Sequence, residues 1–189
     1  VAGTIPIKSE KKEKLFSTCI IYDDKGEMIS AYSKMHLFDV NLPDTNEEYR
    51  ESDIYLNGTE VVTVETPFCK IGLSICYDLR FPELFRKLSE SKAELICLPA
   101  AFTSFTGKAH WEHLIKARAI ENLVYFAASA QGGYHVSGRE TYGNSIIVSP
   151  WGETLGILKN KSGVVVTDIN LESLKKLRSN FPCLDHRII

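Results

Sequence analysis

The sequence predicts an α/β protein in which helices cover a sheet. Between residues 70 and 130, apolar runs alternate with helical patterns in the order strand, helix, strand, helix, strand. This alternation is typical of layered α/β architecture, because each helix must bury its apolar stripe against a sheet. A length of 189 residues falls within the usual size of one domain, so residues 1–189 are expected to form a single domain.

The expected strands are apolar runs rich in β-branched residues. Turn sequences that suit hairpins occur as DDKG at residues 23–26 and as PWGE at residues 150–153. The first and last thirds of the chain are therefore expected to be antiparallel or mixed. The predicted strands lie at residues 1–7, 15–24, 27–34, 60–66, 69–77, 93–100, 123–131, 144–150 and 163–170.

Helices are expected in three places. Residues 80–93 form the first, with Pro82 tolerated in its first turn. Residues 109–123 form the second, because their apolar side chains recur near one helical face. Residues 171–178 form a short third helix after Asn170, a suitable N-cap. Residues 41–53 are expected to be a polar loop long enough to carry function.

Charge and hydropathy narrow the class of partner. The net charge is −2, from 22 basic and 24 acidic side chains that are mixed along the chain. No basic stripe of the kind that binds nucleic acid is present in the sequence, so a small-molecule ligand is favoured. No apolar run approaches the roughly 20 residues of a membrane helix, so no membrane partner is expected.

The five cysteines are odd in number, widely spaced and never arranged as CxxC. This pattern supports neither a disulfide framework nor a zinc site, so we expect a reducing, cytoplasmic setting and no cofactor or metal. His110 and His113 stand three positions apart, which is not the HExxH spacing of a zinc protease.

Cys76 ends the apolar run KIGLSIC and directly precedes the first predicted helix. Such a position lies at the carboxyl end of a strand, where the ligand crevices of α/β sheets open. Taken alone, Cys76 reads more readily as a small buried hydrophobe than as a nucleophile, and Lys34 as a snorkelling surface lysine. If the two side chains meet, however, the Lys34 ammonium would favour the thiolate and could hold a developing oxyanion.

Five sequence blocks run through essentially the whole chain. They are YSKMHLFDVNLP, ESDIYLNGTE, KIGLSICYDLRFPEL, LPAAFTSFTGKAHWEHLIKARAIEN and YGNSIIVSPWGE. Together, in their order and spacing, these blocks resemble the nitrilase superfamily of carbon-nitrogen hydrolases. This resemblance implies a nitrilase-like α-β-β-α four-layer sandwich that commonly forms a homodimer.

The resemblance also implies roles for particular residues. Cys76 matches the family nucleophile, and Lys34 matches the lysine that stabilises the tetrahedral intermediate together with a backbone N–H, here that of Tyr77. Glu51 matches a second glutamate that orients the lysine or the substrate, with a solvated loop carboxylate as the alternative.

Other residues of the matching blocks are expected to contact substrate or to support the structure around the nucleophile. Phe102 and Thr103 follow a strand end that faces the same crevice, so they are expected to contact substrate, with core packing as the equal alternative. Arg80 and Glu83 are expected to form a structural ion pair beside the nucleophile.

The family's general base is a glutamate on an early strand, upstream of the segment that VAGTIPIKS resembles. Glu10, Glu13 and Glu27 fall outside that motif, so none of them is assigned the role. We therefore expect that this chain lacks the first strands and helices of the sandwich. Without the base, we expect it to be inactive or poorly folded.

Residues 127–153 look most like the Nit branch of the superfamily and, within it, like the amidases that hydrolyse deaminated glutathione. The resemblance implies hydrolysis of a small amide through a cysteine thioester. The ω-amidases that act on 2-oxoglutaramate are the alternative substrate class. A catalytically dead relative that serves as a binding or oligomer-forming module is an alternative of a different kind.

Overall fold

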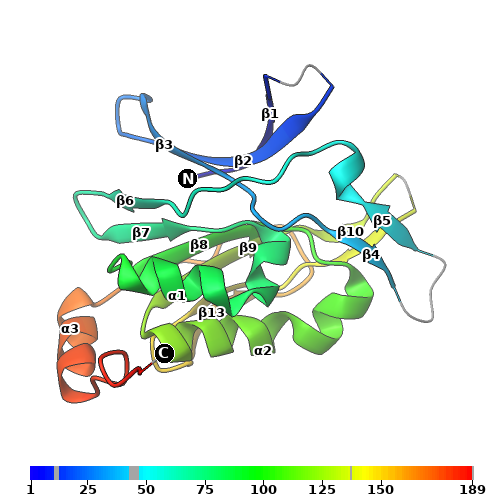
Figure 1. Ribbon diagram of the computed structural model, residues 1–189. Coiled ribbons are helices and arrows are strands. Elements are labelled where there is room, and N and C mark those ends of the chain that lie inside the picture. Colours follow the sequence, from blue (N-terminus) through cyan, green and yellow to red (C-terminus); the bar gives the residue numbers. More distant parts are fainter. Residues whose placement is uncertain (11–12, 43–46, 137, 189) are drawn as a thin grey trace.

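A six-stranded sheet forms the centre of the computed structural model, which describes residues 1–10, 13–42, 47–136 and 138–188 (Figure 1). β7, β8 and β9 run parallel, whereas β6, β12 and β13 are antiparallel to their neighbours. The parallel strands are joined by helices, as the alternating pattern predicted. The strand order is β13 (Thr154–Leu158), β12 (Ser145–Val148), β9 (Tyr125–Ala130), β8 (Leu95–Ala100), β7 (Lys70–Leu73) and β6 (Thr63–Glu65).

A second, antiparallel sheet consists of β1 (Ala2–Lys8), β2 (Leu15–Tyr22) and β3 (Met28–Ser33). It lies on the side of the central sheet opposite α1 and α2 (Figure 1). Two short ribbons project at one end of the molecule: β4 (Asp39–Asn41) with β5 (Glu48–Arg50), and β10 (Gly132–Tyr134) with β11 (Glu140–Tyr142).

The α-helices are α1 (Pro82–Glu90), α2 (Ser104–Asn122) and α3 (Leu171–Asn180), and two 3-10 helices are η1 (Glu51–Asp53) and η2 (Cys76–Arg80). Each α-helix starts at a suitable residue. Pro82 opens α1, and the side-chain oxygens of Thr103 and Asn170 accept hydrogen bonds from Thr106 N at 3.3 Å and from Ser173 N at 2.9 Å. None of the helices in the described part of the chain combines the length and apolar character needed to cross a membrane.

The core fills both spaces that border the central sheet. Cys19 and Tyr32 from the smaller sheet pack in the same buried cluster as Phe126, and Phe85 and Trp111 carry that cluster to the helices. Each fully buried large apolar side chain of this kind contributes roughly 1.5–3 kcal/mol. The result is a helix layer and two sheets, which are three of the four layers expected for a nitrilase-like sandwich.

Several expectations from the sequence need correction. Residues 163–170 are not a strand, because Val164 and Val166 are 83% and 86% exposed and have no sheet to pair with in the described structure. The PWGE turn instead leads directly into β13, which the sequence pattern did not indicate. Residues 41–53 contain β5 and η1 rather than a plain loop, and residues 43–46 of that segment lie outside the described residues.

Candidate active site

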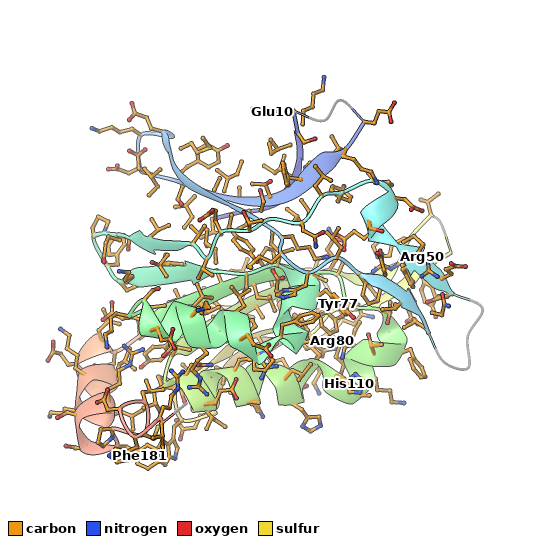
Figure 2. All side chains as sticks on the ribbon, viewed as in Figure 1. Glu10, Arg50, Tyr77, Arg80, His110 and Phe181 are labelled. Atoms are coloured by element: carbon orange, nitrogen blue, oxygen red, sulfur yellow. The ribbon has the colours of Figure 1, made fainter. Side chains whose placement is uncertain are left out.

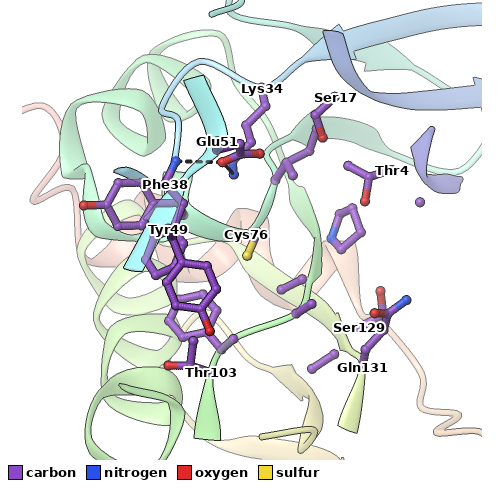
Figure 3. A pocket seen from close by; sticks show the side chains of 18 of the residues that line it. Thr4, Ser17, Lys34, Phe38, Tyr49, Glu51, Cys76, Thr103, Ser129 and Gln131 are labelled. Atoms are coloured by element: carbon purple, nitrogen blue, oxygen red, sulfur yellow. Dashed lines mark hydrogen bonds and ion pairs between the residues drawn. The ribbon is translucent and has the colours of Figure 1, made fainter. Parts of the chain in front are cut away.

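A cavity of about 930 Å³ opens at the carboxyl ends of β7, β8 and β9. Cys76, Lys34 and Glu51 all line it, although they come from three separate segments of the chain (Figure 3). In the close view the Cys76 sulfur points into the centre of the space, with Lys34 and Glu51 on one side and Tyr49 on another. The structure therefore brings together the three residues that the sequence singled out for catalysis.

Cys76 has a backbone φ of 47°, in the left-handed region that residues other than glycine rarely adopt. Such strain persists only where the surroundings fix it, and it concentrates at functional sites. Three contacts hold this turn: Ser74 N donates to Cys97 O at 3.1 Å, Ile75 N donates to Asp78 Oδ2 at 2.9 Å, and Arg118 Nε donates to Leu79 O at 3.0 Å. The sulfur is thus displayed by a constrained turn between β7 and η2.

Asp78 links this turn to the segment that follows β3. Its carboxylate is fully buried, and Oδ2 also accepts from the Tyr32 hydroxyl at 2.7 Å. Oδ1 lies 3.1 Å from His36 N and 2.7 Å from His36 Nδ1. Because Lys34 lies between Tyr32 and His36, these bonds fix the lysine relative to Cys76. The sequence analysis did not identify Asp78, and the signal for it was a carboxylate directly after an apolar run.

The Lys34 side chain is almost fully buried, with 3% of the residue exposed. Its ammonium forms an ion pair with Glu51 Oε2, which also accepts a hydrogen bond from Phe38 N at 2.6 Å. The alternative readings, a snorkelling Lys34 and a solvated Glu51, are therefore wrong. A buried ammonium needs a paired charge, and Glu51 supplies it while fixing the position of the lysine nitrogen.

The pKa of the Cys76 thiol is raised above its ordinary value, chiefly because burial disfavours the thiolate. Lys34, the backbone N–H of Ala101 and Arg139 all act in the opposite direction, and Glu51 adds to the rise. The sequence argument correctly expected Lys34 to favour the thiolate, but burial outweighs that effect. The thiol form is therefore the resting form at neutral pH, and an attacking thiolate requires that a base remove its proton.

Aromatic side chains form one wall of the cavity. The Tyr77 ring packs edge-on against Phe38, with ring centroids 4.9 Å apart, and Phe38 also contacts Tyr49 at 5.0 Å. Phe102 lines the cavity but is 95% buried against Trp111, so packing takes most of its surface. Thr103 also lines the cavity, but its hydroxyl is engaged with Thr106. Packing therefore accounts for most of the surface of both residues, and their contact with substrate stays a prediction.

Arg80 does not form the expected ion pair with Glu83 in the described structure. Its guanidinium instead lies over the rings of Tyr77 and Phe102, and Nη1 is 3.3 Å from His110 Nδ1 (Figure 2). A helical i, i+3 ion pair between Arg80 and Glu83 cannot compete here, because Arg80 belongs to η2 and faces α2.

No carboxylate that the structure describes occupies the position of a free general base in the cavity. The acidic residues of the lining are Glu48 and Glu51, and each is paired with a basic residue. Glu10, Glu13 and Glu27 are exposed, and Glu10 lies on the far side of the smaller sheet from Tyr77 (Figure 2). Within the same described residues, no group of three His, Cys, Asp or Glu side chains is placed to hold a metal ion.

The fold and the site together define an α/β protein with a cysteine, a buried lysine and a glutamate at the carboxyl edge of its sheet. The family model described as carbon-nitrogen hydrolase matches residues 1–179. The chain therefore belongs to the carbon-nitrogen hydrolase family, which confirms the resemblance drawn from the five sequence blocks.

Curated relatives agree with this family. The chain is 44% identical over 191 residues to deaminated glutathione amidase of Synechocystis, a match that covers 100% of this chain and 70% of the relative. It is 41% identical over 182 residues to deaminated glutathione amidase of Dictyostelium discoideum, covering 96% of this chain and 62% of the relative. The chain thus spans less than two thirds of the length of some of the curated relatives it matches.

Solved structures show the same fold. The NitFhit protein of C. elegans superimposes with a TM-score of 0.89 at 39% identity, over 96% of this chain and 44% of that one. An amidase from Nesterenkonia sp. AN1, solved with acrylamide added to its active-site cysteine, has a TM-score of 0.75 at 26% identity. That match covers 95% of this chain and 66% of the amidase.

Proposed function

We propose that this protein hydrolyses a small amide through a covalent intermediate on Cys76. The Cys76 thiolate would attack the amide carbonyl, the amine would leave with a proton, and water would hydrolyse the resulting thioester. The observation that carries the proposal is the convergence of the Cys76 sulfur, the buried Lys34 ammonium and the Glu51 carboxylate on one cavity. The adduct on the active-site cysteine of the Nesterenkonia amidase supports the same role for Cys76.

The proposed roles of the other residues follow from charge and position. The tetrahedral intermediate carries an oxyanion, and a buried, preorganised ammonium stabilises it more strongly than water would. Lys34 provides that ammonium, and the backbone N–H of Tyr77, in the first turn of η2, provides a second donor. Glu51 holds the Lys34 ammonium in place through their ion pair. Phe102 and Tyr77 form the wall against which the acyl group packs.

Deaminated glutathione is the proposed substrate, since the relatives from Synechocystis and Dictyostelium discoideum carry the name deaminated glutathione amidase. Its hydrolysis gives 2-oxoglutarate and cysteinylglycine. The ω-amidase reaction on 2-oxoglutaramate is the second candidate, because it releases the same acid from a smaller amide. A cavity of about 930 Å³ is large enough for the larger substrate.

We also propose that residues 1–189 turn over amides slowly by themselves. The raised pKa of Cys76 calls for a base, and the two acidic residues that line the cavity are already paired. A binding or oligomer-forming module that has lost catalysis is the competing proposal.

The test is an amidase assay of the chain with deaminated glutathione and with 2-oxoglutaramate, alongside iodoacetamide labelling. Cys76→Ala should abolish any turnover, and Cys69→Ala is the matched control because Cys69 lies outside the cavity. The labelling is carried out at alkaline pH, because burial raises the pKa of Cys76, and rapid labelling confined to Cys76 there supports a chemically competent site. Indifference of all five thiols would favour the catalytically dead module, and brisk turnover would contradict the proposed lack of a base.

Assembly and location remain part of the proposal. We propose a cytoplasmic homodimer built from a single carbon-nitrogen hydrolase domain, supported by the family resemblance and by cysteines that are all free. Sedimentation of the purified protein over a range of concentrations tests the dimer. A monomer at every concentration would contradict it.

A further inference from the structure

The charges that line the cavity do not cancel. Lys34 is paired with Glu51, and Arg50 Nη2 lies 2.8 Å from Glu48 Oε1. Arg80 and Arg139 line the same cavity, and neither has a carboxylate partner among the described residues. The cavity therefore carries an excess of positive charge beside Cys76. An anionic ligand would supply the missing counter-charges.

Arg139 is held in one orientation. Its Nη2 donates to the carbonyl of Ala101 at 2.7 Å, and its guanidinium carbon lies 5.2 Å from the centroid of the Tyr49 ring. These two contacts come from different walls of the cavity, since Ala101 follows β8 and Tyr49 belongs to β5. A guanidinium fixed in this way loses little further freedom when it binds a planar carboxylate.

Part of the Arg139 guanidinium has no partner. Its Nε is buried, yet it makes no hydrogen bond within the described structure. Buried N–H groups are normally satisfied, and an exception at a functional cavity calls for an explanation. Arg80 differs, because its guanidinium is already covered by two rings and approaches His110. Arg139 is thus the arginine with the greater unused binding capacity.

We infer that Arg139 determines specificity by binding a carboxylate of the substrate, so that the amides hydrolysed are anionic ones. This inference rests on the proposed amidase function and assigns the residue that would recognise the carboxylate that both proposed substrates carry away from the reacting bond. Arg139 directly precedes β11, whereas Cys76, Lys34 and Glu51 come from other parts of the chain. The substrate carboxylate would then be held away from the oxyanion. A contact at that distance can discriminate between substrates without altering the chemical step.

Alkylation of Cys76 tests the inference without any need for turnover. Iodoacetate and iodoacetamide react with the same thiolate, but only iodoacetate carries a carboxylate. Loss of the Arg139 charge changes the reactivity of the thiolate equally for both reagents, because Arg139 acts on the pKa of Cys76. The ratio of the two rates therefore isolates recognition of the anion. Arg139→Met should lower the iodoacetate to iodoacetamide ratio by about threefold or more.

Two further variants make the alkylation result decisive. Arg139→Gln also removes the charge but keeps an N–H that can donate to Ala101 O, so it serves if Arg139→Met does not fold. Arg187→Gln is the matched control, since it removes the charge of an arginine that pairs with Glu90 outside the cavity, and it should leave the ratio unchanged. An unchanged ratio in folded Arg139→Gln overturns the inference, whatever the outcome of the amidase assay.

Steady-state kinetics supply the second readout where turnover is measurable. Succinamate carries a carboxylate, and butyramide is a neutral amide of the same chain length. Arg139→Gln should lower kcat/KM for succinamate by about ten- to a hundredfold and change that for butyramide by less than about twofold. Equal losses on both amides indicate a structural role and contradict the inference. If the wild-type protein hydrolyses neither amide, that result contradicts the proposed amidase function, and the alkylation ratio still decides the inference about Arg139.

Discussion

Asp78 accepts two hydrogen bonds from His36, one from the backbone nitrogen at 3.1 Å and one involving Nδ1 at 2.7 Å. The two residues lie far apart in the chain, and this contact joins the turn that carries Cys76 to the segment that carries Lys34. Tyr32 and Ile75 add further hydrogen bonds to the same carboxylate. The relative position of sulfur and ammonium therefore depends on one buried side chain.

Asp78→Ala is expected to destabilise the protein strongly. The substitution leaves the Tyr32 hydroxyl and the Ile75 N–H buried without their acceptor, which should cost about 3 kcal/mol of the free energy of unfolding. Urea denaturation measures this loss. Asp24→Ala, in the exposed turn between β2 and β3, is the control and should change stability by less than about 0.5 kcal/mol. Equal stability of the two variants would contradict the linking role of Asp78.

Glu51→Gln is expected to impair both stability and catalysis. The Lys34 ammonium is buried, and without the Glu51 carboxylate it has lost its counter-charge, which should cost about 3 kcal/mol. If Lys34 holds the oxyanion, kcat/KM should also fall by about a hundredfold. The control is Glu65→Gln, which breaks an exposed pair with Lys70 and should cost less than about 1 kcal/mol. Urea denaturation and amidase kinetics on the same samples separate the loss of stability from the loss of kcat/KM. A Glu51→Gln variant with wild-type kinetics would exclude a role of Glu51 in supporting Lys34.

The rate at which iodoacetamide labels Cys76 should rise with pH around a midpoint above that of a free cysteine. The cause is burial, which raises the pKa of the thiol despite the opposing effects of Lys34 and Arg139. Lys34→Met removes the largest of the opposing effects, so its midpoint should move higher still. Labelling rates measured across the alkaline range test both shifts. A midpoint below that of free cysteine in the wild-type protein would mean that the surrounding positive charges outweigh burial.

Stability should fall at alkaline pH because the thiols of Cys19, which is buried, and Cys97, which is half-buried, have raised pKa values. Burial raises the pKa of Cys97 to about 12 and that of Cys19 to about 11. Unfolded cysteines titrate near pH 8.5, so above this pH the unfolded chain binds fewer protons than the folded one and the free energy of unfolding decreases. The decrease continues until the folded thiols ionise near their own pKa values. Urea denaturation at about pH 7.5 and about pH 10 measures it, and Cys97→Ala should reduce the difference between the two pH values.

The sequence predicted the parts of the fold whose signals are local. The alternation of β7, α1, β8, α2 and β9 follows from apolar periodicity, and Asn170 caps α3 as expected. The three-residue strands β4, β5, β10 and β11 are too short to show a period. Val164 and Val166 look like strand residues, but a β-branched run becomes a strand only where a neighbouring strand offers hydrogen bonds.

The residues of the candidate site were likewise predicted only in part from the sequence. Cys76, Lys34 and Glu51 could be predicted because together they match the order and spacing of a family. Asp78 and Arg139 were missed because their roles depend on partners that are distant in the chain: Tyr32 and His36 for the first, Ala101 for the second. The local signal at Asp78, a carboxylate directly after an apolar run, does not indicate which distant groups it binds.

The turn at Cys76 also sets a condition for protein design. Its left-handed φ of 47° is sustained by hydrogen bonds that Asp78 accepts, two of them from Tyr32 in β3 and from His36 after it. A short loop containing the cysteine would lose this support if it were grafted onto another scaffold. The smallest transferable unit therefore comprises two discontinuous peptides, residues 32–36 and residues 74–79, together with partners that replace Cys97 O and the Arg118 guanidinium. A scaffold that accepts only one peptide would present a thiol without its geometry.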